Sequence, residues 1–361
     1  MKNKKKKILI VAGGTGGHVF PAYNLCEDLR SKRNYVEIIT DKRGEIFLNK
    51  YDKRKFKTIF SSTINYKNPI SFLFSIMIIF MSFLQSIFLI RNKKADLVIG
   101  MGGYTSLPFC MASKVLDVPF IIYENNLLLG KANKFLLPFS EKILISYKEL
   151  KGIKSKYFDK IVVTGNILSK KILNFNTSTT KKKSSKLLSV LILGGSQAAN
   201  SFGKKLPVII KRCREKNIKV AVYQQCTNDQ IKKLKKYYSE LKIKHEVFNF
   251  KNNLHNYFKK IDICITRAGS SMLAELVNCR VPFISIPLPN SADNHQLLNA
   301  EYFKKKKFGF LIEEIDIEKK LFVLINSFNK DRSVLSKIII NQKRYNDKDV
   351  YKKIEKSVEE I

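Results

Sequence analysis

One pattern recurs along this chain: a short apolar run ends in a glycine-rich turn, and an amphipathic stretch follows. Residues 8–12 lead into Gly13-Gly14-Thr15-Gly16-Gly17, residues 97–100 lead into Gly102-Gly103, and residues 188–193 lead into Gly194-Gly195. Short apolar runs that alternate with helical periodicity are typical of βαβ units. The sequence therefore predicts an α/β protein built on parallel sheets.

The pattern restarts halfway along the 361 residues, which predicts two domains. The expected strands are residues 8–12, 35–40, 57–60, 97–100, 120–123, 142–146, 161–164, 188–193, 219–223, 245–248, 261–266, 283–287 and 309–312. Residues 174–186 are polar and of low complexity, as expected of a loop near the domain junction. We expect an N-terminal domain over 1–164, a C-terminal domain over 165–340, and a helix in 341–361 that packs back on the N-terminal domain. Two doubly wound domains of this kind bind ligands in a cleft, beyond the carboxyl ends of their strands.

The charge is strongly basic, with 67 Lys and Arg against 30 Asp and Glu, or +37. Such a balance predicts attraction to polyanions, either nucleic acid or an anionic membrane. The lysines are spread along the chain, and Trp is absent while Lys, Asn, Ile, Phe and Tyr are abundant, as in AT-rich genomes. Solvated surface is therefore the simpler explanation. Nucleic-acid binding, which needs clustered Arg among aromatics, is a distant alternative. The six scattered cysteines, without a CxxC pair, favour a reducing, cytosolic compartment.

Residues 70–90 form a segment without a charged side chain. The segment is long enough to cross a bilayer, which takes about 20 residues. A spanning helix, a buried core helix and an interfacial helix are all consistent with that length. Ser71, Ser75, Ser82 and Ser86 gather on one helical stripe, and expected strands of one sheet lie on either side of the segment. These features argue against spanning and favour a helix with one face on the protein and another on lipid. The basic residues before residue 8 precede an apolar run too short for a signal peptide, so we expect a strand there.

The loop from Gly13 to His18 combines four glycines with a following helix N-terminus, an arrangement suited to binding an anion. It is not a Walker A loop, and Val19 stands where the dinucleotide fingerprint needs glycine. His18 is either a structural residue or a general base that removes a hydroxyl proton.

Further strand ends carry polar groups that should converge on the same edge of each sheet. In the first half these are residues 100–104 (GMGGY) and 123–126 (YENN); in the second half they are 194–197 (GGSQ), 266–271 (TRAGSS) and 293–296 (DNHQ). Glu275 lies one turn inside the helix expected after residue 271. It is either a first-turn acid favoured by the helix dipole or an acceptor for a ribose diol.

These motifs, in this order and over nearly the whole chain, resemble the MurG family, the UDP-N-acetylglucosamine–N-acetylmuramyl-(pentapeptide) pyrophosphoryl-undecaprenol N-acetylglucosamine transferases. The resemblance implies a GT-B glycosyltransferase that moves N-acetylglucosamine from UDP-GlcNAc to the muramyl 4-hydroxyl of lipid I, with inversion, forming lipid II. It implies no metal and no other cofactor. It also implies a peripheral enzyme at the cytoplasmic face of the inner membrane, with cell-wall synthesis and division proteins as partners and without nucleic acid. A related sugar-nucleotide transferase with another acceptor is the nearest alternative.

Residue by residue, the resemblance makes His18 the candidate base. It assigns the acceptor diphosphate to loops containing Gly13, Gly14, Gly102, Gly103 and Tyr104. The residues that it assigns to UDP-GlcNAc are Thr15, Gly16, Gly17, Asn126, Ser169, Ser196, Lys251, Ser270, Ser271, Met272, Leu273, Ala274, Glu275 and Gln296. Within that set, Ser196 contacts the diphosphate, the backbone at Lys251 contacts uracil, Glu275 contacts ribose and Gln296 contacts the sugar.

Two positions depart from the family pattern. Ser169 stands where the family commonly has an arginine near the donor diphosphate, and a neutral hydroxyl cannot replace a guanidinium there. We expect Lys170 or Lys171 to supply the charge from within the cleft. Tyr123 stands where many members have histidine, which weakens any mechanism that requires a second histidine.

Overall fold

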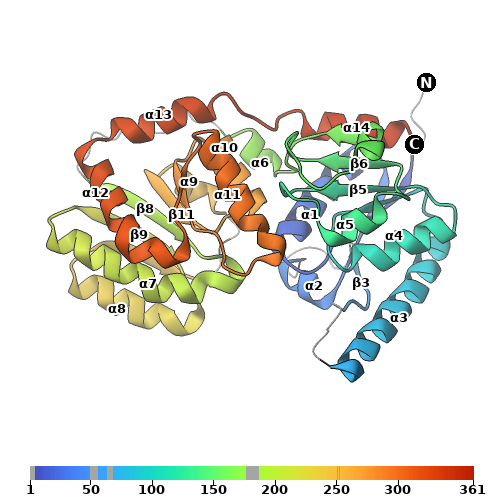
Figure 1. The fold of residues 1–361 in the computed structure, drawn as a ribbon, viewed down its shortest axis with the longest axis horizontal. Coiled ribbons are helices and arrows are strands. Elements are labelled where there is room, and N and C mark those ends of the chain that lie inside the picture. The colour runs from blue at the N-terminus through green and yellow to red at the C-terminus, as the bar shows by residue number, and fades with distance from the viewer. Residues whose placement is uncertain (1–4, 49–55, 63–67, 176–186, 250, 252) are drawn as a thin grey trace. The chain divides into compact units, whose positions relative to one another are not determined.

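The computed structural model describes residues 5–48, 56–62, 68–175, 187–249, 251 and 253–361. The chain divides into two compact units, one formed by Met1–Lys170 with Asp347–Ile361 and the other by Lys171–Asn346. Each unit is a parallel sheet with helices packed around it (Figure 1).

The first unit has a seven-stranded sheet in the order β3-β2-β1-β4-β5-β6-β7. Its strands are β1 (Lys7–Val11), β2 (Tyr35–Thr40), β3 (Phe56–Thr58), β4 (Leu97–Gly100), β5 (Phe120–Glu124), β6 (Lys142–Ile145) and β7 (Ile161–Val163). Its helices are α1 (Gly16–Ser31), α2 (Lys42–Leu48), α3 (Pro69–Lys93), α4 (Ser106–Val115), α5 (Lys131–Leu136) and α14 (Val350–Glu359), and α6 (Lys170–Leu173) begins at the boundary between the units. Strand order reverses between β1 and β4, so the loops after these strands diverge at a topological switch point.

The second unit repeats this design with six strands in the order β10-β9-β8-β11-β12-β13. Its strands are β8 (Leu188–Leu193), β9 (Val220–Gln225), β10 (Lys244–Phe248), β11 (Ile263–Thr266), β12 (Phe283–Ser285) and β13 (Phe310–Leu311). Its main helices are α7 (Gly195–Glu215), α8 (Ile231–Glu240), α9 (His255–Phe258), α10 (Ser270–Asn278), α11 (His295–Lys305), α12 (Phe322–Lys330) and α13 (Ser333–Gln342). The switch point lies between β8 and β11, whose apolar side chains are buried on both faces, as in parallel sheets generally.

Helix α14 belongs to the first unit although it follows the whole second unit in the chain. It packs against α1, and the buried Tyr351 hydroxyl donates to the Leu168 carbonyl at 2.6 Å. Lys6 Nζ donates to the Val358 carbonyl at 2.7 Å, and Lys32 forms an ion pair of 2.7 Å with Glu355. These contacts join the beginning of β1 and the end of α1 to one late helix.

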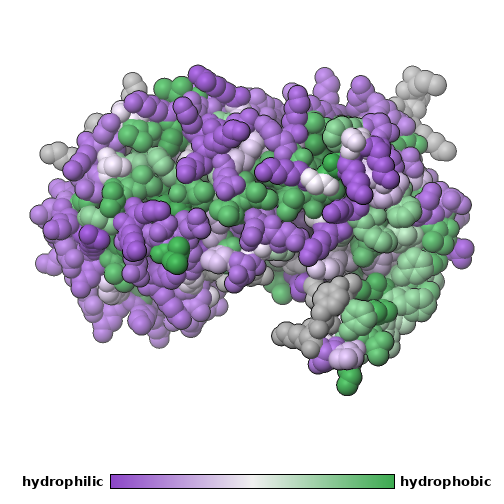
Figure 2. Space-filling model, viewed as in Figure 1, coloured by the Kyte–Doolittle hydropathy of each residue, from purple (hydrophilic) through white to green (hydrophobic). Residues whose placement is uncertain are grey.

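Helix α3 turns its polar stripe inward and its apolar side chains outward. Ser75, Ser82 and Ser86 are buried, and the last two are linked by a hydrogen bond from the Ser86 hydroxyl to the Ser82 carbonyl. The exposed side chains are Ile70, Leu73, Phe74, Ile76, Met77, Phe80, Met81, Leu84 and Phe88. Figure 2 shows this apolar surface over α3. Within the described part of the chain, α3 is the helix that is long and apolar enough to cross a membrane, judged by length and composition alone.

Candidate functional site

In the first unit, the loops after β1, β4 and β5 meet at the carboxyl edge of the sheet. Ser106, after the 100–104 turn, donates to the carbonyls of Val11 at 3.1 Å and Gly102 at 2.8 Å. Asn125, after β5, donates from Nδ2 to the Gly17 carbonyl at 3.1 Å. The three motifs expected to converge in this unit therefore do so.

His18 lies half-buried in the first turn of α1, with its ring against the turn after β4. A Cβ at Gly102 would lie 3.2 Å from His18 Cε1, and a Cβ at Gly103 would lie 3.8 Å from His18 Cδ2. Both glycines have positive φ angles, which side-chain-bearing residues adopt at a cost. The double glycine thus gives the imidazole room at the edge of the site, while the neighbouring Tyr104 is exposed.

Asn126 is oriented by a buried carboxylate. Its Nδ2 donates to Glu124 Oε1 at 3.1 Å and to Asn125 Oδ1 at 3.0 Å. The other carboxylate oxygen of Glu124 accepts from the Gly130 N–H at 2.9 Å and from Asn133 Nδ2 at 3.0 Å. Asn133 was not expected from the sequence, because it lies inside α5 and carries no motif of its own.

Asp41, at the end of β2, is a second residue that the sequence did not reveal. Its Oδ1 accepts the backbone N–H groups of Gly14 at 3.0 Å and Gly44 at 2.8 Å, and its Oδ2 accepts from Thr105 at 3.2 Å. Burial disfavours the charged form, but these N–H donors and the Arg43 guanidinium outweigh it and hold the pKa of Asp41 below its usual range. The Gly14 N–H, expected to be open to a ligand, is therefore already occupied by the protein.

In the second unit, α7 and α10 begin at the ends of the adjacent strands β8 and β11. Ser196 lies in the first turn of α7, and its side chain is outside the described residues. Ser270, Ser271 and Met272 form the first turn of α10. Leu273 and Ala274 are fully buried, and the Leu273 N–H donates to the Gly269 carbonyl at 3.1 Å. Their side chains are thus part of the core.

Helix α11 is tied to the same loop. Asn299 Nδ2 donates to the Ala268 carbonyl at 3.2 Å, and Gln296 Oε1 accepts from the Leu288 N–H at 3.0 Å. The motif at residues 293–296 and the motif at 266–271 therefore lie near each other in this unit, as expected from their positions at strand ends.

Buried Arg267 and half-buried Glu314 form an ion pair of 2.7 Å next to that loop. Arg267 also donates to the Pro287 carbonyl at 3.1 Å, and Glu314 accepts from Ser201 at 2.6 Å. Burial opposes ionisation, but hydrogen bonds from Ser201 and Arg267 lower the pKa of Glu314 to about 2. This pair connects the loop at 266–271 to the segment after β13. Glu314 lies in a region where the sequence showed no motif.

Glu275 has the opposite electrostatic character. Burial raises the pKa of its carboxyl from 4.5 to about 7, so close to neutral pH the group is divided between its acid and its carboxylate. Strongly perturbed carboxyl groups beside a loop at a strand end are frequent in functional sites.

Lys251 follows β10, and its ammonium lies over the rings of Phe248 and Tyr257. It is paired with Glu246, which also accepts from the Tyr257 hydroxyl at 2.6 Å. The hydrogen bonds from Lys251 and Tyr257 lower the pKa of Glu246. The preceding residue, Phe250, lies outside the described residues.

The two positions that depart from the family pattern have clear surroundings. Ser169 directly precedes α6 and is half-buried, and the ammonium of Lys170 pairs with Asp28 of α1 at 2.7 Å. The Tyr123 hydroxyl is buried, contacts Ser146 Oγ at 2.9 Å and accepts from the Ile167 N–H at 3.1 Å. Burial raises the pKa of Tyr123, so this phenol serves as a neutral structural bridge.

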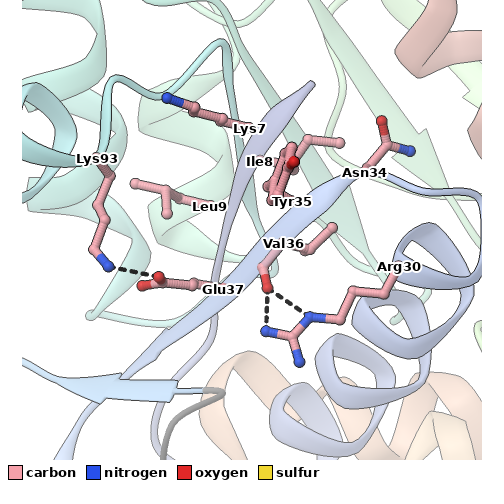
Figure 3. Close-up of a pocket in the computed structure, with 9 residues that line it drawn as sticks. All are labelled: Lys7, Ile8, Leu9, Arg30, Asn34, Tyr35, Val36, Glu37 and Lys93. Atoms are coloured by element: carbon pink, nitrogen blue, oxygen red, sulfur yellow. Dashed lines mark hydrogen bonds and ion pairs between the residues drawn. The ribbon is translucent and has the colours of Figure 1, made fainter. Parts of the chain in front are cut away.

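A hollow of about 460 Å³ lies elsewhere on the first unit, at the amino-terminal ends of β1 and β2. Figure 3 draws the residues that line it. Lys93 pairs with Glu37 there at 2.5 Å, and Arg30 donates from Nε to the Val36 carbonyl at 2.7 Å. None of the expected site residues lines it. In the described residues, no group of three or more His, Cys, Asp or Glu side chains is arranged to hold a metal ion.

Comparisons with known proteins agree with this arrangement. The glycosyltransferase family 28 N-terminal domain matches residues 8–145, and the corresponding C-terminal domain matches residues 189–354. A UDP-N-acetylglucosamine–N-acetylmuramyl-(pentapeptide) pyrophosphoryl-undecaprenol N-acetylglucosamine transferase from Pelagibacter ubique is 37% identical over 356 residues, covering 97% of this chain and 96% of that relative. A transferase of the same name from Rickettsia bellii is 37% identical over 331 residues, covering 89% and 91%.

Solved structures show the same fold. The crystal structure of Acinetobacter baumannii MurG has a TM-score of 0.80 at 20% identity, covering 99% of this chain and 100% of the other. A UDP-N-acetylglucosamine 2-epimerase has a TM-score of 0.67 at 13% identity, covering 98% and 95%. The expectation of a GT-B fold with two doubly wound units is confirmed.

Proposed function

Because this chain belongs to the MurG family, we propose that it transfers N-acetylglucosamine from UDP-GlcNAc to the muramyl 4-hydroxyl of lipid I and so forms lipid II for peptidoglycan. The observation that supports this most strongly is 37% identity over 97% of the chain to a transferase with that name. The enzyme is thus a UDP-GlcNAc-dependent glycosyltransferase.

In this proposal the acceptor belongs to the first unit. His18 removes the proton from the acceptor hydroxyl, since a neutral imidazole is a competent base near pH 7. The role of His18 as base is supported by the placement of its ring against Gly102 and Gly103, where the loops after β1, β4 and β5 meet. The hydroxyl then attacks the anomeric carbon in line with the departing UDP, which inverts the configuration at that carbon.

The donor belongs to the second unit. The first turn of α10, which begins with Ser270 and Ser271, has the backbone N–H groups of a helix N-terminus, which suit a diphosphate. Glu275, one turn further, accepts hydrogen bonds from the ribose hydroxyls, and Gln296 contacts the sugar. Negative charge grows on the diphosphate as UDP leaves, and N–H donors fixed beforehand stabilise it without reorganising.

The charge that an arginine at position 169 would supply needs another source. Lys170 is paired with Asp28, whereas Lys171 is exposed at the start of α6. We therefore assign the substitute role to Lys171. Lys171→Gln is expected to raise the KM for UDP-GlcNAc, and an unchanged KM would refute the assignment.

The outward face of α3 is proposed to dock on the cytoplasmic leaflet of the membrane that carries lipid I. Nine exposed large apolar side chains along one helix exceed what a soluble surface normally presents. Arg91 and Lys94, both exposed at the end of the helix, suit lipid phosphates.

A transfer assay tests the proposed reaction. The purified protein is given lipid I together with UDP-GlcNAc, UDP-glucose or UDP-GalNAc, and product is measured by mass. Lipid II is expected with UDP-GlcNAc alone. Transfer to a different acceptor, with lipid I inert, would instead support a related sugar-nucleotide transferase.

Vesicle sedimentation tests the membrane contact. Binding to anionic vesicles is expected to weaken in high salt and in a Phe74→Ser, Phe80→Ser variant, while Val323→Ser, at an exposed apolar position of the second unit, serves as the control. Resistance to extraction by alkaline carbonate would show an integral helix and would contradict this proposal.

A further inference from the structure

The glycine loops proposed to receive the acceptor diphosphate contain no cation of their own. Residues 12–19, 100–106 and 123–130 include no lysine and no arginine. Two buried carboxylates, Asp41 and Glu124, lie directly behind these loops. A diphosphate placed there would meet negative charge unless a nearby side chain compensates for it.

Arg43 is positioned to provide that compensation. Its Nη2 would be 3.8 Å from a Cβ on Gly14, so the guanidinium lies in contact range of the loop. The side chain is 51% exposed, in contrast to the 4% exposed side chain of Asp41. The same Nη2 that is anchored on Asp41 thus lies beside Gly14, and about half of the side chain remains accessible to solvent.

The anchor fixes the guanidinium precisely. Arg43 donates to Asp41 Oδ2 from Nη2 at 2.7 Å and from Nε at 3.1 Å. The same carboxylate accepts the Gly14 N–H and the Thr105 hydroxyl, so it joins the loops after β1 and β4 to α2. A change in the Arg43 position would therefore be coupled to the position of both loops.

We propose that Arg43 binds the diphosphate of the prenyl-linked acceptor, with Asp41 as the residue that positions it against Gly14. The guanidinium suits this ligand because its planar donors match phosphate oxygens and because it stays charged at every physiological pH. This inference rests on the proposed function, and it adds a binding residue that no sequence motif indicated.

The test compares Arg43→Gln with Lys42→Gln. Lys42 is exposed and adjacent on α2, so both variants lose one charge from the same helix. Initial rates are measured with lipid I and UDP-GlcNAc varied in turn. Arg43→Gln is expected to raise the acceptor KM about 10- to 100-fold, the effect of one charged hydrogen bond, with the donor KM unchanged. Lys42→Gln is expected to change neither.

Inorganic pyrophosphate provides a second readout. It should compete with lipid I in the wild-type enzyme, and this competition should weaken in Arg43→Gln. An unchanged acceptor KM in Arg43→Gln would overturn the inference. Loss of UDP affinity together with acceptor affinity would also overturn it, since Arg43 would then only support the fold. A wild-type enzyme that fails to transfer to lipid I would instead refute the proposed function.

Discussion

Replacing Glu275 by glutamine should make the stability of the protein less dependent on pH. In the unfolded chain this carboxyl has an ordinary pKa near 4.5, whereas burial raises the folded value to about 7. Between these two values the folded protein holds a proton that the unfolded chain has released. The free energy of unfolding therefore falls as pH rises through this window and is unaffected below it.

The size of the effect follows from the same two values. A separation from 4.5 to about 7 corresponds to at most about 3 kcal/mol of destabilisation, reached once the pH exceeds the folded pKa. Glu275→Gln cannot ionise, so at pH 8 it should be more stable than the wild type by up to that amount, and at pH 4 the two should be similar. Under the proposed function, the wild type keeps this cost because the carboxylate accepts hydrogen bonds from the ribose.

Urea unfolding at pH 4, 5, 6, 7 and 8 measures the stability difference, with Glu318→Gln, an exposed acid of the same unit, as the control. Calorimetry of UDP binding in two buffers measures the affinity for UDP and the proton released on binding. The wild type should release a proton on binding near pH 6.5 and lose affinity below pH 7, whereas Glu275→Gln should bind weakly at every pH. Parallel stability curves for the wild type and Glu275→Gln would refute the reasoning.

Three further substitutions test other parts of the molecule. His18→Ala should lower turnover about 100-fold or more while UDP affinity is retained, as measured by initial rates and calorimetry; near-normal turnover would exclude His18 as the base. Gly102→Ala should strain a backbone with φ of +89° and displace the His18 ring. Turnover should therefore fall while the donor KM changes less. A fully active variant would show that the ring position is not critical. Tyr351→Phe leaves the Leu168 carbonyl without its donor and should cost about 1 kcal/mol in urea unfolding, an effect absent if water replaces the hydroxyl.

The elements of the fold were predictable because each depends on local sequence. The apolar runs at 8–12, 97–100 and 188–193 correspond to the central strands β1, β4 and β8, and the glycine turns follow them as expected. The serine stripe of α3 was visible as a helical period, and it is the buried face. Alternation of strands and helices with short connections leaves few other topologies open.

The supporting residues of the site were not predictable in this way. Asp41 contacts residues 27 positions before it and 64 positions after it, and no spacing in the sequence encodes such contacts. Glu314 and Arg267 are likewise far apart in the chain. The available signal was the position of these residues: Asp41 and Arg267 directly follow β2 and β11, and Glu314 lies shortly after β13. Residues just beyond the carboxyl ends of parallel strands lie at the ligand-binding edge of their sheet, whether or not the loop contains glycine.

The path of the chain through α14 has a consequence for how the protein is made. During synthesis, the residues that complete the first unit leave the ribosome after all of residues 171–346, so α14 can add its contacts to that unit only after the second unit has been translated. Until Tyr351 and Val358 arrive, Leu168 and Lys6 lack the groups they bind in the finished protein. A chain released before α14 is made would carry a complete second unit together with a first unit that lacks its last helix, open to proteases and chaperones.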